Sequence, residues 1–151
     1  MRVVPAVLDR TILAGLLLLP LVGVLASVAL AGRAGLLVAG VVAGGAVLYA
    51  GVTWFAGARV ELARRLADME VAPEDARVEA LGRTAGRNLL KTLPLYAVAV
   101  LATFVDALVA VLAVGAGLGL VAVLTAVVIN RAEAAGGGRI VRDGEGALRR
   151  F

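Results

Sequence analysis

Three long apolar stretches constrain this chain more than any other feature of its sequence. Residues 11–31 and 35–58 are uncharged and are separated by a short segment that contains Arg33, and residues 92–130 have one charged residue, Asp106. A helix needs about 20 apolar residues to cross a hydrocarbon core roughly 30 Å thick. Because 62% of the residues are hydrophobic, against about 45 to 50% in soluble domains, the sequence predicts an integral membrane protein.

The third stretch is too long for one membrane-spanning helix and barely long enough for two, so a tight hairpin is expected there. Its turn is predicted at residues 114–119, where glycines are densest. The predicted fold class is therefore all-α, an integral membrane bundle of four transmembrane helices in two hairpins. The helices are expected at residues 11–31, 35–58, 93–113 and 118–135, within a single transmembrane domain at residues 1–135.

Two charged segments lie outside these helices. Residues 59–92 are expected to form a cytoplasmic amphipathic helical connector, made of two short helices broken near Pro73. The apolar faces of these helices would rest on lipid headgroups, or alternatively dock a partner. Residues 136–151 begin with three consecutive glycines and are predicted to be a flexible basic cytoplasmic tail.

The basic residues predict the orientation of the chain. All of them except Arg33 lie before the first apolar stretch, in the connector or after Asn130. The positive-inside rule then predicts a multi-pass protein of the cell membrane with both termini in the cytoplasm. The net charge of +4 is expected to face anionic lipid headgroups rather than nucleic acid, because the basic residues adjoin apolar stretches and alternate with acidic ones.

A secretory signal is the alternative interpretation of the first apolar stretch. Arg2 and Arg10 precede it, and residues 29–31 have the small-x-small form of a cleavage site. The stretch is longer than the usual apolar region of about 7 to 15 residues in a signal peptide, which favours a membrane-spanning helix.

Small residues recur at helical spacing on the predicted helices. Lipid tails provide no hydrophobic drive for helix association, so close contact between small residues is expected to hold the helices together. Packing within the chain and packing in a homo-oligomer both satisfy this pattern. On the predicted third helix, one face is formed by Tyr96, Ala99, Thr103, Asp106 and Ala110. Other candidate packing residues are Gly40, Gly44, Gly115 and Gly119.

Asp106 has three interpretations, and with Thr103 and Tyr96 it forms a candidate intramembrane polar site. It could hydrogen-bond neighbouring helices, cap the last helix if the turn lies at Asp106, or bind a proton or cation in a hydrated cavity. An Asp at the centre of a spanning helix costs about 2.5 to 3.5 kcal/mol. Because of this cost, we expect Asp106 to have a specific role.

The chemistry of the side chains limits the function further. The chain has no His and no Cys, which excludes Ser-His-Asp and Cys-His arrangements and metal sites with imidazole or thiolate ligands. No catalytic residue, metal or cofactor is predicted. The leading hypothesis is a non-enzymatic accessory or structural subunit that packs within a larger membrane complex or a homo-oligomer. The alternative is a small proton- or cation-coupled transporter or channel that uses Asp106.

Overall fold

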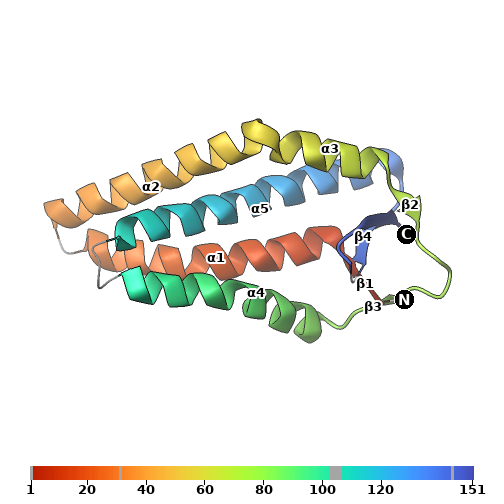
Figure 1. Ribbon diagram of the computed structural model, residues 1–151, viewed down its shortest axis with the longest axis horizontal. Coiled ribbons are helices and arrows are strands. Elements are labelled where there is room, and N and C mark those ends of the chain that lie inside the picture. Colours follow the sequence, from red (N-terminus) through yellow and green to blue (C-terminus); the bar gives the residue numbers. More distant parts are fainter. Residues whose placement is uncertain (1, 31, 103–106, 144) are drawn as a thin grey trace.

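The computed structural model describes residues 2–30, 32–102, 107–143 and 145–151, and is mostly helical, at 76%. Four long helices run side by side, and a small sheet covers one end of them (Figure 1). The long helices are α1 (Ala6–Ala29), α2 (Arg33–Thr53), α4 (Leu81–Ala102) and α5 (Leu108–Gly136). A π-helical turn, η1 (Trp54–Ala58), joins α2 to the short helix α3 (Arg59–Ala67).

Three helical segments among the described residues are long and apolar enough to cross a membrane. They are Ala6–Ala26, Arg33–Ala67 and Leu108–Gly136. Helix α4 lies beside them but has Arg83, Arg87 and Lys91 in its first half, which lowers its hydropathy. By length and composition, the protein therefore has three candidate membrane-spanning segments.

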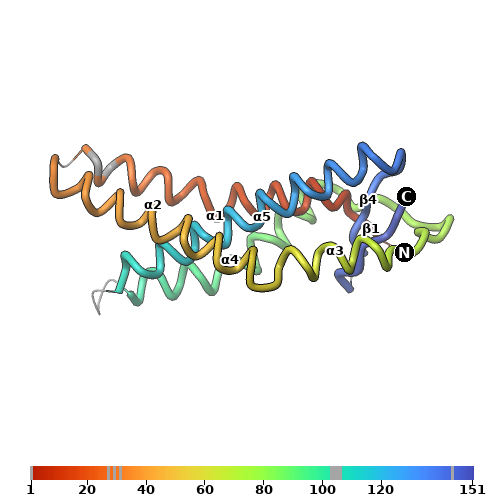
Figure 2. The backbone as a smooth tube through the Cα atoms, turned by 90° about the horizontal axis from the view of Figure 1, so that it is seen from above, coloured from red at the N-terminus to blue at the C-terminus, as the bar shows by residue number. Residues whose placement is uncertain are grey.

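Helix α5 is the central helix of the bundle and packs against both α1 and α2 (Figures 1 and 2). Its glycines allow this close approach. A Cβ atom on Gly117 would lie 2.6 Å from Tyr49 Cδ1, and one on Gly119 would lie 2.8 Å from Leu18 Cδ2. Glycine in a helix interior costs up to about 1 kcal/mol relative to Ala, so these positions are occupied by Gly because of packing.

The turn predicted at residues 114–119 is therefore wrong, because α5 is continuous from Leu108 to Gly136. Glycines that pattern reasoning takes for turn residues are here contact residues. Helix α4 ends at Ala102 and α5 begins at Leu108, both before the predicted turn. The single face proposed from Tyr96 to Ala110 is consequently divided between α4 and α5.

The other helix boundaries also differ from those predicted. Helix α1 begins at Ala6 rather than residue 11 and includes charged residues, and α4 begins at Leu81 rather than residue 93. Asp9 in the added part of α1 pairs with Arg87 in the added part of α4, which helps both helices to extend beyond their apolar stretches. Helix α5 ends at Gly136, and Gly137 adopts a left-handed conformation with φ of 67°, as a helix C-terminus favours.

The sheet has five short strands, in contrast to the predicted all-α class, and 11% of the residues are in strands. The strand order is β2-β5-β4-β1-β3. Strand β4 pairs antiparallel with β1 and β5, whereas β3 lies parallel to β1 and β2 parallel to β5. The strands are β1 (Arg2–Pro5), β2 (Glu70–Val71), β3 (Arg77–Val78), β4 (Ile140–Asp143) and β5 (Leu148–Arg150). We call this sheet the cap.

The cap corrects two predictions, a flexible tail and a wholly helical connector. The tail forms the β4–β5 hairpin, in which Ile140 and Val141 are buried, and β4 pairs with β1, in which Val3 and Val4 are buried. The middle of the connector forms β2 and β3, and its last part, from Leu81 on, is the beginning of α4. Each of these strands has only two residues, so they depend on the pairing partners that β5 and β1 provide.

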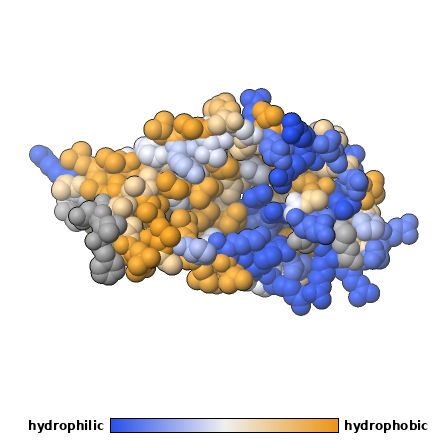
Figure 3. Space-filling view, viewed as in Figure 1, coloured by the Kyte–Doolittle hydropathy of each residue, from blue (hydrophilic) through white to orange (hydrophobic). Residues whose placement is uncertain are grey.

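The first connector helix is present as α3, but its apolar face does not rest on lipid headgroups. Leu62 is buried, and Leu66 and Met69 pack around it against Trp54 and Ile140. Helix α3 thus belongs to the core beneath the cap. Hydrophilic side chains gather at the cap end, and hydrophobic ones predominate over the rest of the visible face (Figure 3).

Candidate functional site

The most buried charged side chain in the described residues is Asp9, in the first turn of α1, with 1% exposure. Its Oδ1 accepts hydrogen bonds from Asn88 Nδ2 at 3.0 Å and from Arg87 Nη2 at 3.3 Å. Its Oδ2 accepts one from Arg142 Nη1 at 2.9 Å. One carboxylate therefore joins α1, α4 and strand β4.

A second carboxylate extends this network towards β3. Glu79 lies just before α4, and its Oε2 is 3.1 Å from Arg87 Nη1 and accepts a hydrogen bond from Thr84 Oγ1 at 3.4 Å. The Glu79 side chain is 7% exposed and Thr84 is fully buried. We call Asp9, Glu79, Arg87, Asn88 and Arg142 the ionic cluster. It contains two carboxylates and two guanidinium groups, so its charges balance.

Burial at the ionic cluster makes the pairing important. An ionised carboxylate without partners is very costly in a low-dielectric interior, and removing one partner of a buried pair typically costs 3 to 5 kcal/mol. The pairs come from the N-terminal helix, the connector and the tail. The cluster thus fixes the cap to the helices.

A smaller cluster organises the tail hairpin. Asp143 Oδ1 accepts hydrogen bonds from the backbone N–H groups of Glu145 and Ala147, and its Oδ2 accepts one from Arg149 Nε at 3.0 Å. Arg149 also donates to Glu70 of β2 at 2.7 Å. Burial alone would raise the pKa of Asp143, but these hydrogen bonds and the Arg149 charge outweigh it, so the pKa lies below its ordinary value.

A crevice runs between α1, α4 and α5. Its part nearer the cap is a cavity of about 250 Å³, lined by Arg10 and Lys91 together with Thr92, Thr125 and apolar side chains. The adjoining cavity, about 300 Å³, continues away from the cap and is lined almost wholly by apolar side chains. The two cavities share Leu17 and Leu95. The crevice therefore has a cationic end and an apolar length.

Tyr96 lines the apolar part of the crevice, and its hydroxyl donates a hydrogen bond to the Leu16 carbonyl of α1. The reason for this bond lies in α1. Pro20 stands one helical turn after Leu16 and has no N–H to offer, so the carbonyl lacks its usual helical donor. Tyr96 replaces that donor.

The other predicted residues occupy different surroundings. Asp106 and Thr103 lie outside the described residues, so their role in a polar site stays a prediction. Ala99 lines the apolar cavity, and Ala110 is exposed on α5.

The four candidate packing glycines divide into two pairs. Gly115 and Gly119 lie in close helix contacts, with Leu95 and Leu18 respectively. A Cβ atom on Gly40 or Gly44 would meet no atom within 4 Å. These two glycines therefore make no close helix contact in this chain.

Sequence reasoning missed the ionic cluster, because it assigned the charges near the apolar stretches to solvent and lipid headgroups. One signal was present. Asp9 is the only acidic residue before the connector, and it stands two residues before the first apolar stretch, where a basic residue alone would suffice for topology. The partners of Asp9 lie far along the chain, and no spacing rule identifies them.

The described residues contain no group of three or more acidic side chains placed to hold a metal ion, and the chain has no His or Cys. The oxygens of Asp9 and Asp143 are occupied by guanidinium, amide and backbone donors. What these two clusters can do chemically is to hold segments together. Comparisons with protein families, with curated proteins and with solved structures gave no match for this chain.

Proposed function

We propose that this protein is a non-enzymatic, multi-pass subunit of the cell membrane that presents its cap as a contact surface to a larger membrane complex or to a second copy. The observation that carries the proposal is the ionic cluster. It ties the N-terminus, the connector and the tail into one folded surface at one end of the bundle. Flexible segments would pay an ordering cost on binding, which a folded cap avoids.

The orientation belongs to the same proposal. We propose that α4 is a fourth spanning helix, entered beyond its basic first half, and that the cap and both termini are cytoplasmic. Both termini lie at the cap end in Figure 1. Arg33 is the one basic residue that lies outside the N-terminus, the connector and the segment after Asn130, and it begins α2 at the other end. The positive-inside rule supports this orientation.

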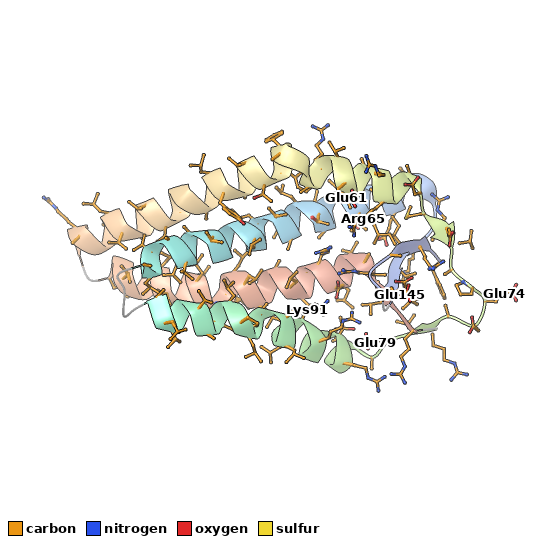
Figure 4. The ribbon with its side chains drawn as sticks, viewed as in Figure 1. Glu61, Arg65, Glu74, Glu79, Lys91 and Glu145 are labelled. Carbon is orange, nitrogen blue, oxygen red and sulfur yellow. The ribbon has the colours of Figure 1, made fainter. Side chains whose placement is uncertain are left out.

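Single cysteines test both parts, because the chain has none of its own. Glu74→Cys places a thiol on the exposed turn between β2 and β3, and Figure 4 shows Glu74 pointing outwards. Arg33→Cys is the matched control at the opposite end. We expect a membrane-impermeant maleimide to label Arg33→Cys in intact cells, and Glu74→Cys only after permeabilisation.

A photoreactive maleimide then tests the contact surface in native membranes. We expect a discrete cross-linked species of higher mass from Glu74→Cys and none of the same mass from Arg33→Cys. Recovery of only the uncross-linked monomer from Glu74→Cys would overturn the subunit proposal. Labelling of both positions from the same side would overturn the topology.

A further inference from the structure

We propose that the crevice between α1, α4 and α5 binds one anionic phospholipid, with its phosphate between Arg10 and Lys91 and an acyl chain along the apolar cavity. The inference rests on the proposed membrane location and names a lipid partner for it. It does not depend on what the cap contacts.

Among the described residues, no acidic side chain lines the cationic end of the crevice. Arg10 and Lys91 line the same cavity, and within the described residues neither has an ion-pair partner at hydrogen-bonding distance. The nearby carboxylate, Asp9, is already held by Arg87 and Arg142. Arg10 and Lys91 therefore add two positive charges beside a cluster that is already neutral.

The position of these cations favours a ligand from the membrane. In Figure 4 the Lys91 side chain lies between the ribbons of α1 and α4, just beyond the ionic cluster. Arg10 is half-buried on α1, and Thr92 and Thr125 line the same cavity. A phosphate group matches this set, because Arg forms paired hydrogen bonds with phosphate oxygens and Lys binds phosphate as a point charge.

The shape of the crevice distinguishes a lipid from a free anion. Inorganic phosphate would use only the cationic cavity, whereas the adjoining cavity of about 300 Å³ is lined by side chains such as Leu17, Val24, Leu95 and Leu112. Both cavities lie between the same three helices and share two lining residues. One amphipathic molecule with an anionic head and an apolar tail fits the whole crevice.

The test uses the full chain, purified in detergent and depleted of lipid. Retention of added lipid is measured by native mass spectrometry, and thermal stability is measured in parallel. The probes are phosphatidylglycerol, phosphatidylcholine with the same acyl chains, and inorganic phosphate. We expect phosphatidylglycerol to be retained at least tenfold better than phosphatidylcholine and to raise the melting temperature, and phosphate alone to have little effect.

Variants locate the site. The double variant Arg10→Gln/Lys91→Gln should lose that tenfold preference, whereas Arg59→Gln/Arg83→Gln, which removes two cations outside the crevice, should keep it. Lys91→Arg should also keep it, which shows that a conservative change leaves a folded and competent site. Ala99→Leu, which narrows the apolar cavity, should weaken retention of long-chain phosphatidylglycerol more than of a short-chain form.

Equal retention of both lipids, or equal losses in the two double variants, would overturn the inference. Binding of inorganic phosphate as tight as that of phosphatidylglycerol would reject the lipid and leave an anion site. A cross-link from Glu74→Cys without any lipid preference would reject this inference alone. A lipid preference without a cross-link would reject the subunit role and leave this inference standing.

Discussion

The two ends of the helix bundle are held together by different physical means. In the half next to the cap, every buried polar side chain of the described residues is found, among them Asp9, Thr84, Asn88 and Asp143. In the far half, the core is apolar and consists of Leu21, Val42, Ala46 and Ala116. Specific charge pairs fix the cap half, and the fit of small against large side chains fixes the far half.

The comparison also explains where each half fails. Removing one partner of a buried ion pair lowers the stability of the folded protein strongly, because the other charge stays buried without a partner. At a close helix contact made by a glycine, there is no free space for an added side-chain atom, because the helices are densely packed there. Removing a charged side chain should therefore destabilise the half next to the cap, and adding side-chain atoms at a glycine should destabilise the far half.

The largest effect is expected from Asp9→Ala. This change leaves Arg87 and Arg142 without their shared carboxylate and should lower the free energy of unfolding by about 3 to 5 kcal/mol. The measurement is denaturant unfolding in detergent micelles. Glu61→Gln is the control, because its pair with Arg65 is exposed and exposed pairs contribute little to stability. Equal losses in the two variants would contradict the role of the ionic cluster.

Gly117→Ala should have the next largest effect. Its Cβ would meet Tyr49 and the Ala46 carbonyl at 2.6 and 3.0 Å, so overpacking should cost about 1 to 3 kcal/mol. Gly44→Ala is the matched control in open space and should be neutral or stabilising, since Ala is the better helix former. Thermal unfolding in the same detergent compares them. A stabilised Gly117→Ala protein would show that α2 and α5 do not meet as described.

Tyr96→Phe should cost about 0.6 to 2 kcal/mol, the range for hydrogen bonds between membrane helices. The stronger test is a double-mutant cycle with Pro20→Ala. That change restores an N–H for the Leu16 carbonyl, so the loss of the Tyr96 hydroxyl should then matter less. Additive effects of the two substitutions on unfolding would break the link between Pro20 and Tyr96.

Acid should loosen the tail hairpin. Because the pKa of Asp143 is lower in the folded protein than its ordinary value of 3.8, its contribution to stability is present above about pH 4. It is lost as the pH falls through the folded pKa. The protection of the β4 and β5 amides against hydrogen exchange, relative to the intrinsic rate at each pH, should fall in that acidic window in the wild type. Asp143→Asn should show faster exchange at neutral pH and less dependence on acid; an unchanged profile would exclude the carboxylate as the cause.

Asp106→Asn should have the smallest effect, and the quantity measured is proton or cation flux. If the protein is a non-transporting subunit, proteoliposomes should show no proton or cation flux that differs between this variant and the wild type. Flux in the wild type that the substitution abolishes would instead support the transporter hypothesis and locate functional polar chemistry away from the cap.

The sequence by itself determined that the chain has stretches long and apolar enough to cross a membrane, and that its charged and apolar segments are separate. Both are composition and length effects that act along a single stretch of chain. It also identified small residues as packing candidates, but not which of them lie in close contacts: Gly119 lies against Leu18, whereas a Cβ atom on Gly44 would meet no described atom within 4 Å. The turn was predicted at the wrong residues because glycine is common both in tight turns and in close helix contacts.

Only the tertiary structure decided the cap and the ionic cluster. Strands β2 and β3 have two residues each, too few for any alternating pattern, and they form because β5 and β1 lie beside them. Asp9 meets Arg87 and Arg142 across most of the chain's length. Such contacts depend on how the helices bring distant segments together, and local sequence patterns do not predict that arrangement.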